Sequence, residues 1–197
     1  MPLRHLAALL GRRLAAAANV LVRTPIGRTM PALDATLEKA LNHHVTEELA
    51  ASHRYLASSA ALREAGLSGM AHWMQIQSDE ERVHAMKFLD HIHARHGHIR
   101  LEAIPAPPPA DNGGLAAFQA ALALEESTTL RIHELHGKAT AANDVALRVF
   151  LEWFVQEQVQ EEDTIRHILD RFRLAQNDPA ALLLLDQELG NRAAAGA

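Results

Sequence analysis

The chain has 197 residues, enough for one well-packed domain, and its 48% share of hydrophobic residues is ordinary for a globular protein. It contains no cysteine, which excludes disulfide frameworks, thiolate metal sites and thiol nucleophiles. Abundant alanine and leucine beside a single tyrosine favour helix over sheet. No apolar run approaches the roughly 18 residues that a membrane-spanning helix needs, and we expect a cytoplasmic protein.

The net charge of −5 is distributed unevenly along the chain. Residues 1–33 hold five arginines and no acidic residue; subtracting these five from the 19 basic residues leaves 14 against 24 acids, a net charge of −10 for residues 34–197. We therefore expect a basic amphipathic extension at 1–33, a main domain at 34–190 and a flexible tail at 191–197. Such an extension is typical of a transit peptide, a membrane-surface helix or a nucleic-acid tail. Met30-Pro31 offers a competing start, which would make residues 1–29 a start-site artefact.

Hydrophobic periodicity predicts four long helices, at 34–65, 69–96, 115–141 and 145–174, and a short one at 180–189. Gly66 is expected to end the first helix and Ser68 to start the second. Four prolines and a pair of glycines exclude regular structure from residues 96–114. Two short connections and one long crossover predict an all-α four-helix bundle of two antiparallel hairpins.

Polar residues interrupt each of the four predicted core stripes once, near the middle of the helix. Counting about 1.5 Å per residue from the turns brings them to one level of the bundle. Buried carboxylates are costly unless a cation lies between them. One nitrogen among many oxygen ligands suits iron or manganese better than zinc, and ligands from four helices suit a dinuclear centre. The six residues are Glu48, Glu81, His84, Glu125, Gln158 and Glu161.

Two stretches, EERVHAMKFLDHI and FLEWFVQEQVQEEDTIRHILDR, resemble the non-haem ferritins of bacteria, and the similarity covers residues 34–190. The resemblance implies a ferritin-like diiron carboxylate bundle in which Glu48, Glu81 and His84 hold one iron. Glu81 would bridge to a second iron held by Glu125 and Glu161.

The same resemblance assigns roles to residues around the diiron pair. Gln158 would lie beside the two irons, and Tyr55 would supply an electron during oxidation. Trp153 matches a tryptophan of the family. A weaker third iron site would comprise Glu80, Glu157, Gln160 and Glu161, where the neutral Gln160 replaces an acid.

The function implied is iron storage, detoxification and homeostasis. A ferroxidase centre would oxidise Fe²⁺ with dioxygen or hydrogen peroxide, and a cage of twenty-four subunits would hold the ferric mineral. We expect no haem, because Arg82 stands where haem-binding relatives have a methionine, and Gln158 and Glu161 stand where they have a second Glu-x-x-His.

Two alternatives remain open. The basic extension could attach a ferritin-like bundle to DNA or an anionic membrane, with iron chemistry secondary. A diiron enzyme acting on an organic substrate is the other, although the sequence indicates no substrate pocket. A second group of histidines, at the end of the second helix, is interpreted as a solvated face and comprises His91, His93, His96 and His98.

Overall fold

The computed structural model describes residues 32–110 and 113–193, and within these ranges the chain forms helices, turns and loops but no strand. The helices are α2 (Ala35–Glu64), α3 (Ser68–Ala94), α4 (Gly114–Ala141), α5 (Val145–Ala175) and α6 (Pro179–Leu189). Every bound lies within two residues of its prediction. Of the extension predicted at 1–33 and the tail predicted at 191–197, residues 1–31 and 194–197 lie outside the described residues. Within the predicted tail, Arg192 is held by hydrogen bonds to α3.

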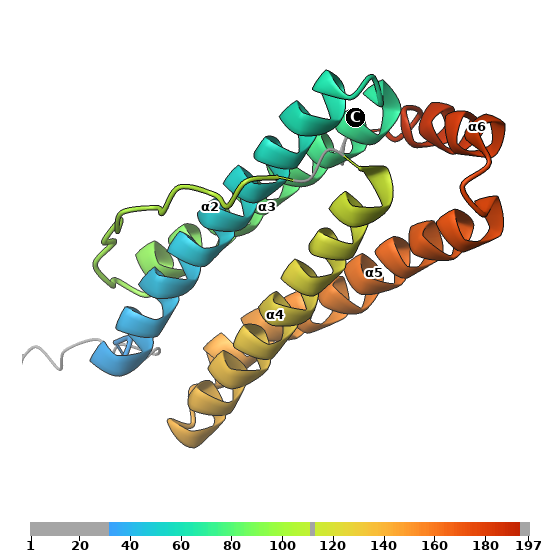
Figure 1. Cartoon of the computed structure of the whole chain (residues 1–197). Coiled ribbons are helices and arrows are strands. Elements are labelled where there is room, and N and C mark those ends of the chain that lie inside the picture. Colours follow the sequence, from blue (N-terminus) through green and yellow to red (C-terminus); the bar gives the residue numbers. More distant parts are fainter. Residues whose placement is uncertain (1–31, 111–112, 194–197) are drawn as a thin grey trace, which may run out of the picture. The chain divides into compact units, whose positions relative to one another are not determined.

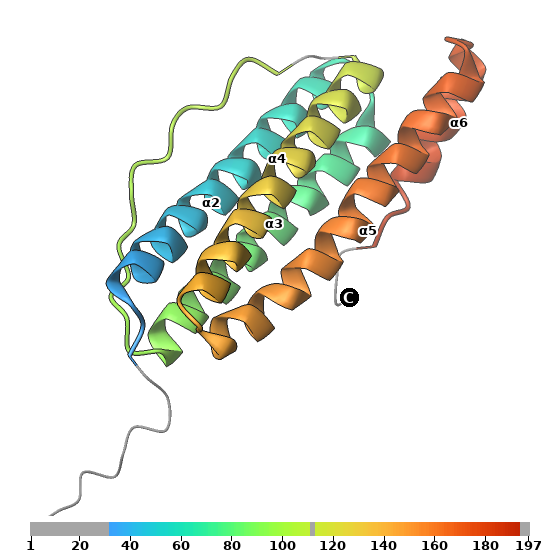
Figure 2. The same cartoon turned by 90° about the horizontal axis from the view of Figure 1, so that it is seen from below.

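The four long helices pair as two antiparallel hairpins, α2 with α3 and α4 with α5 (Figures 1 and 2). The crossover between α3 and α4 runs along α2 and returns the chain to the other end of the bundle, so that α3 and α4 point the same way (Figure 2). Asn42 on α2 fixes this crossover, since its side-chain oxygen accepts the Arg100 N–H at 2.6 Å and its amide nitrogen donates to the His98 carbonyl at 2.9 Å. The fold is the predicted all-α bundle with a short C-terminal helix.

The helix α3 begins at Ser68, the residue expected to start it, but its cap comes from a distant part of the chain. Ser68 does not cap this helix, because the residue at the cap position is Leu67, which provides no side-chain hydrogen bond. Asp186 of α6 caps it instead, accepting the Met70 N–H at 2.8 Å and the Gly69 N–H at 3.1 Å. A side chain at Gly69 would not fit, because its Cβ would lie 1.7 Å from the Asp186 carbonyl oxygen. A carboxylate at a helix N-terminus satisfies free N–H groups and complements the helix dipole, so this contact anchors α6 on α3.

The core consists of two hydrophobic clusters, one towards each end of the bundle. Each long helix contributes to both clusters, and its polar interruption falls between the two contributions. Thus α3 supplies Met70 and Met74 to one cluster and Phe88 and Ile92 to the other, with Glu81 between them. The apolar clusters therefore enclose a polar level in the middle of the bundle. Among the described residues, no helix is both long and apolar enough to cross a membrane.

Candidate metal centre

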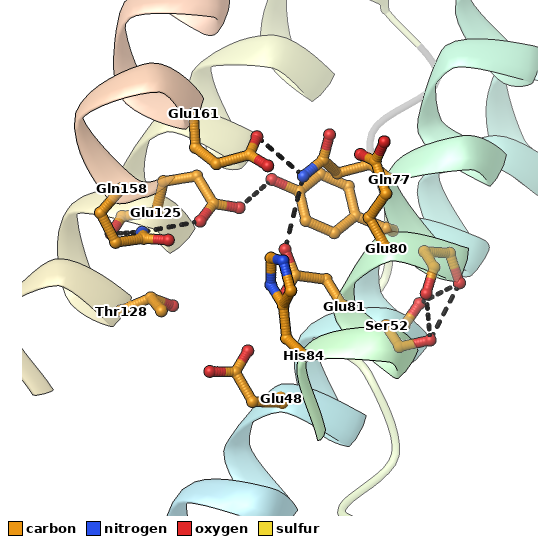
Figure 3. Close-up of polar contacts among 12 residues, drawn as sticks. Glu48, Ser52, Gln77, Glu80, Glu81, His84, Glu125, Thr128, Gln158 and Glu161 are labelled. Atoms are coloured by element: carbon orange, nitrogen blue, oxygen red, sulfur yellow. Dashed lines mark hydrogen bonds and ion pairs between the residues drawn. The ribbon is translucent and has the colours of Figure 1, made fainter. Parts of the chain in front are cut away.

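The six residues predicted to share one level lie together in the interior. Glu48 comes from α2, Glu81 and His84 from α3, Glu125 from α4, and Gln158 and Glu161 from α5 (Figure 3). All six are buried, and the most exposed of them, Glu161, has only 8% of its surface accessible. Helical spacing explains the arrangement, because each residue occupies a core position of an amphipathic stripe.

Glu48, Glu81 and His84 form a group that is able to hold a metal ion. One potential ligand atom from each of them lies within 4.8 Å of the other two. His84 Nδ1 is 3.5 Å from a Glu81 carboxylate oxygen. Both carboxylate oxygens of Glu48 are buried without a hydrogen-bond partner among the described residues. An unsatisfied buried carboxylate is costly, and a cation between these side chains would satisfy it.

Glu125 is held by side chains from two other helices. The Tyr55 hydroxyl on α2 donates a hydrogen bond to one oxygen of its carboxylate. The Gln158 amide nitrogen on α5 donates to the other oxygen at 3.1 Å and also to the Glu125 backbone carbonyl at 3.2 Å. Both predicted residues therefore contact the acid cluster through the same carboxylate, and they fix its orientation.

Gln77 belongs to the site although sequence reasoning did not assign it a role. It is fully buried on α3, one turn before Glu81. Its amide nitrogen donates to Glu161 at 2.9 Å and lies 3.5 Å from a Glu81 oxygen (Figure 3). Its position in the sequence could have indicated this contact, because residues four apart are neighbours on one helix face and the Gln77 amide can therefore reach Glu81.

Burial and mutual repulsion keep protons on this cluster. Burial, strengthened by the charges of neighbouring acids, raises the pKa of Glu125 and that of Glu161 to about 8. Burial also raises the pKa of Glu81, to about 7, and shifts the pKa of Glu48 upwards. For His84, burial alone would lower the pKa, but pairing with Glu81 and attraction to the other carboxylates raise it to about 9. The raised pKa values mean that protons neutralise much of the negative charge of this cluster. A bound metal cation would displace these protons and neutralise the charge in their place.

A second histidine, His44, lies beside Glu48 and was not predicted as a site residue. Its Nε2 is 2.8 Å from a Glu48 oxygen without meeting hydrogen-bond geometry. Its ring packs 4.4 Å from that of Phe88, and burial lowers the pKa of His44 to about 3. The imidazole is therefore neutral and adds no charge to offset the Glu48 carboxylate.

The residues of the predicted third site lie at the edge of the cluster. Glu80 and Glu157 are half-buried and line a pocket of about 250 Å³ together with His84 and Trp153. Gln160, by contrast, is exposed. Trp153 packs edge-on to His84 at 5.5 Å between ring centroids, and the Lys87 ammonium lies over the indole ring at 3.1 Å.

The second group of histidines lies away from the acid cluster, at the end of α3. His91 stacks on Phe150 at 4.2 Å between ring centroids and is half-buried. His93, His96 and His98 are exposed, as expected for a solvated face.

Comparison with known proteins assigns the chain to a family. The family model described as a ferritin-like domain matches residues 38–175. A bacterial non-heme ferritin of Staphylococcus haemolyticus is 35% identical over 160 residues, which cover 81% of this chain and 96% of the relative. A bacterial non-heme ferritin of Bacteroides fragilis is 34% identical over 156 residues, which cover 79% of this chain and 97% of the relative.

Solved structures give the same result. The open pore ferritin of the hyperthermophilic archaeon Archaeoglobus fulgidus superposes with a TM-score of 0.81 and 37% identity, covering 82% of this chain and 100% of that one. An engineered closed form of the same ferritin matches with a TM-score of 0.81 and 38% identity, over 82% and 99% of the two chains. From its matched domain, its relatives and its fold, the chain belongs to the ferritin family.

Proposed function

We propose that this ferritin stores iron and that the buried polar level is a dinuclear ferroxidase centre. One observation carries the proposal: four carboxylates and an imidazole, contributed by all four long helices, converge in the core, and both oxygens of Glu48 lack hydrogen-bond partners among the described residues. A buried cluster of this charge is stable when cations neutralise it. The names of the relatives, non-heme ferritins, support iron as the cation.

The geometry supports one assignment of ligands. Glu48, Glu81 and His84 would bind the first Fe²⁺, since their ligand atoms already lie within 4.8 Å of one another. Glu125 and Glu161 would bind the second, with Glu81 shared between the two ions. Carboxylates are hard oxygen donors that favour Fe³⁺ over Fe²⁺, so this ligand set promotes loss of an electron from each ion.

In the proposed reaction the iron is the substrate and later the cargo. Two Fe²⁺ ions lose one electron each. Dioxygen accepts both electrons with two protons and leaves as hydrogen peroxide; where peroxide is the oxidant, it takes two electrons and two protons and yields two water molecules. Fe³⁺ then moves to the stored mineral.

Two residues next to the ions would tune the site. Gln158 donates to Glu125, so we assign it the role of orienting that carboxylate. Tyr55 donates to the other oxygen of Glu125 and lies within reach to supply an electron to the iron pair. Both roles act through Glu125, and replacing either residue should affect the second iron more than the first.

Storage further requires a cavity, and we infer a homo-oligomeric cage of twenty-four subunits. The number twenty-four is the one implied by the resemblance to bacterial ferritins, and apolar side chains exposed on the single chain support self-association. Leu183 and Leu184 of α6 have 59% and 66% of their surfaces accessible. Adjacent leucines exposed on one helix form a contiguous apolar surface, which favours burial against another subunit. Light scattering of the purified protein measures the subunit number directly, and a monomer would contradict the inference.

The ferroxidase proposal is tested by following Fe²⁺ oxidation optically in air, with the parent beside a Glu81→Ala/His84→Ala double variant. We expect fast oxidation by the parent and its loss in a variant that still assembles. A Glu126→Gln variant provides a control, because Glu126 is an exposed neighbour of Glu125 that pairs with Arg166. Equal rates in parent and double variant would mean that the buried polar level is not the oxidation site.

A further inference from the structure

Arg192, just beyond α6, reaches the edge of the candidate metal centre. Asp186 anchors α6 on the start of α3, as described above, and a backbone hydrogen bond from the Arg192 N–H to the Leu189 carbonyl continues the turn. The chain after α6 therefore lies against α3. The Arg192 side chain is 21% exposed, so the guanidinium is largely shielded from solvent.

The guanidinium has defined partners on three sides. One of its nitrogens donates to the Gln77 side-chain oxygen at 2.9 Å, and another donates to a Glu80 carboxylate oxygen. Its Cζ atom lies over the Trp73 ring, 4.5 Å from the ring centre. The backbone carbonyl of Arg192 also contacts a ring nitrogen of His72 at 3.1 Å. A planar fork that bonds two acceptors and stacks on an indole is pre-organised, and lysine would not reproduce this geometry.

These contacts determine how Gln77 faces the metal centre. The amide oxygen of Gln77 accepts from Arg192, so the amide nitrogen must point the other way, towards Glu161 and Glu81. Were the amide reversed, its oxygen would face the Glu161 carboxylate and its nitrogen would face a cation, which is unfavourable on both sides. Arg192 thus fixes the direction of the Gln77 amide N–H groups, which face Glu161 and Glu81, two proposed iron ligands.

The contact with Glu80 has a second consequence. Glu80 is the residue of α3 that would contribute to a third iron site with Glu157 and Glu161. The guanidinium already pairs with a Glu80 oxygen, so a cation that bound the Glu80 carboxylate would lie close to the positive charge of Arg192. Repulsion between like charges in a partly shielded site weakens the binding of that cation.

We propose that Arg192 is a positioning residue of the iron centre: it stands in for a third cation at Glu80 and, through Gln77, orients the donor to Glu161 and Glu81. The proposal rests on the proposed diiron function. It attributes the weakness of the third site to a residue of the C-terminal segment and not to Gln160 alone, so that each subunit binds two divalent ions tightly and the third only poorly.

The test is an anaerobic titration of the full-length protein with Co²⁺, followed by its visible absorption and by equilibrium dialysis. The parent is compared with Arg192→Met, which keeps an unbranched apolar side chain over Trp73, and with Arg192→Lys, which keeps the charge. We expect two tightly bound ions per subunit in the parent, and a third in Arg192→Met that binds on the order of tenfold tighter than in the parent. Arg192→Lys should restore weak third-site binding, and Glu80→Gln added to Arg192→Met should abolish the gain.

The outcomes separate this inference from the function on which it rests. If the parent binds two ions and Arg192→Met binds the same two with the same third-site affinity, Arg192 is not a positioning residue and the diiron proposal stands. If the parent binds no ion tightly, or if Glu81→Ala/His84→Ala leaves binding unchanged, the diiron proposal itself fails. Circular dichroism and assembly size of Arg192→Met check that the helices and the oligomer are retained.

Discussion

Loading the metal-free centre with Fe²⁺ should expel protons, and four of its five proposed ligands set a lower bound on their number; burial also raises the pKa of the fifth, Glu48, so a proton held there would add to the count. At pH 7 a pKa of about 8 leaves nearly one proton on each of Glu125 and Glu161, a pKa of about 9 leaves one on His84, and a pKa of about 7 leaves half on Glu81. Metal ligands bind in their deprotonated forms, so two Fe²⁺ ions should release roughly three protons per subunit.

The count depends on pH in a defined way. It should rise to roughly four protons at pH 6, where Glu81 is also protonated, and fall to about two at pH 8, where Glu125 and Glu161 are half ionised. With unperturbed pKa values for the same four groups, release would be under about one proton at pH 6 and close to zero at pH 8. The two cases therefore differ by about three protons at pH 6 and about two at pH 8.

The assay adds Fe²⁺ anaerobically to the metal-free protein in weak buffer and reads a pH indicator. Calorimetry in two buffers of different ionisation enthalpy gives an independent count. The Glu125→Gln variant, which carries no proton to displace at that position, should release about one fewer proton at pH 6. Release that stays below one proton from pH 6 to pH 8 would refute the reasoning that burial keeps this cluster protonated.

Three further predictions concern single elements of the structure. Asp186→Ala removes two hydrogen bonds from the start of α3 and should lower the free energy of unfolding by about 2 kcal/mol in a denaturant titration. Gln187→Ala, on the exposed face of α6, is the control, and an unchanged free energy in Asp186→Ala would mean that this contact does not anchor α6. Tyr55→Phe leaves a Glu125 oxygen without its donor, and a hydrogen bond to a charged group contributes about 1.5–3 kcal/mol, so the variant should bind the second Fe²⁺ at least tenfold more weakly in a binding titration. Unchanged affinity would mean that Tyr55 does not support this iron. Deleting residues 1–29 should leave the rate of Fe²⁺ oxidation unchanged, because every proposed ligand lies at or beyond Glu48. Binding to DNA and to anionic vesicles is measured before and after the deletion, and its loss would support the attachment alternative.

Much of the fold could be predicted from local sequence because its boundaries have local causes. Gly66 at the end of α2 adopts a positive φ of 82°, and Asn143, between α4 and α5, has a φ of 53°. Both turns were placed within two residues, since glycine and asparagine favour this conformation. The level shared by the six polar residues was likewise predictable, because helical rise converts residue number into height.

What could not be predicted depends on residues distant in sequence. Local sequence correctly placed the start of α3 at Ser68, but its cap is Asp186, which lies 116 residues after Met70 and leaves no local signal. Gln77 lies one turn before Glu81, and this spacing indicates a contact with Glu81, but the shorter hydrogen bond to Glu161 on α5 depends on tertiary packing. Arg192 contacts Gln77 across 115 residues, and no helical periodicity connects the two. Periodicity identifies which side chains face inward, whereas tertiary packing decides which of them meet.

The central claim is that two iron ions bind between the carboxylates of the polar level. Crystals grown without metal and loaded anaerobically with Fe²⁺ test it directly through anomalous diffraction at the iron edge. We expect two peaks per subunit, one among Glu48, Glu81 and His84 and one among Glu81, Glu125 and Glu161. Iron peaks that avoid this level, or none at all in protein that still oxidises Fe²⁺, would contradict it.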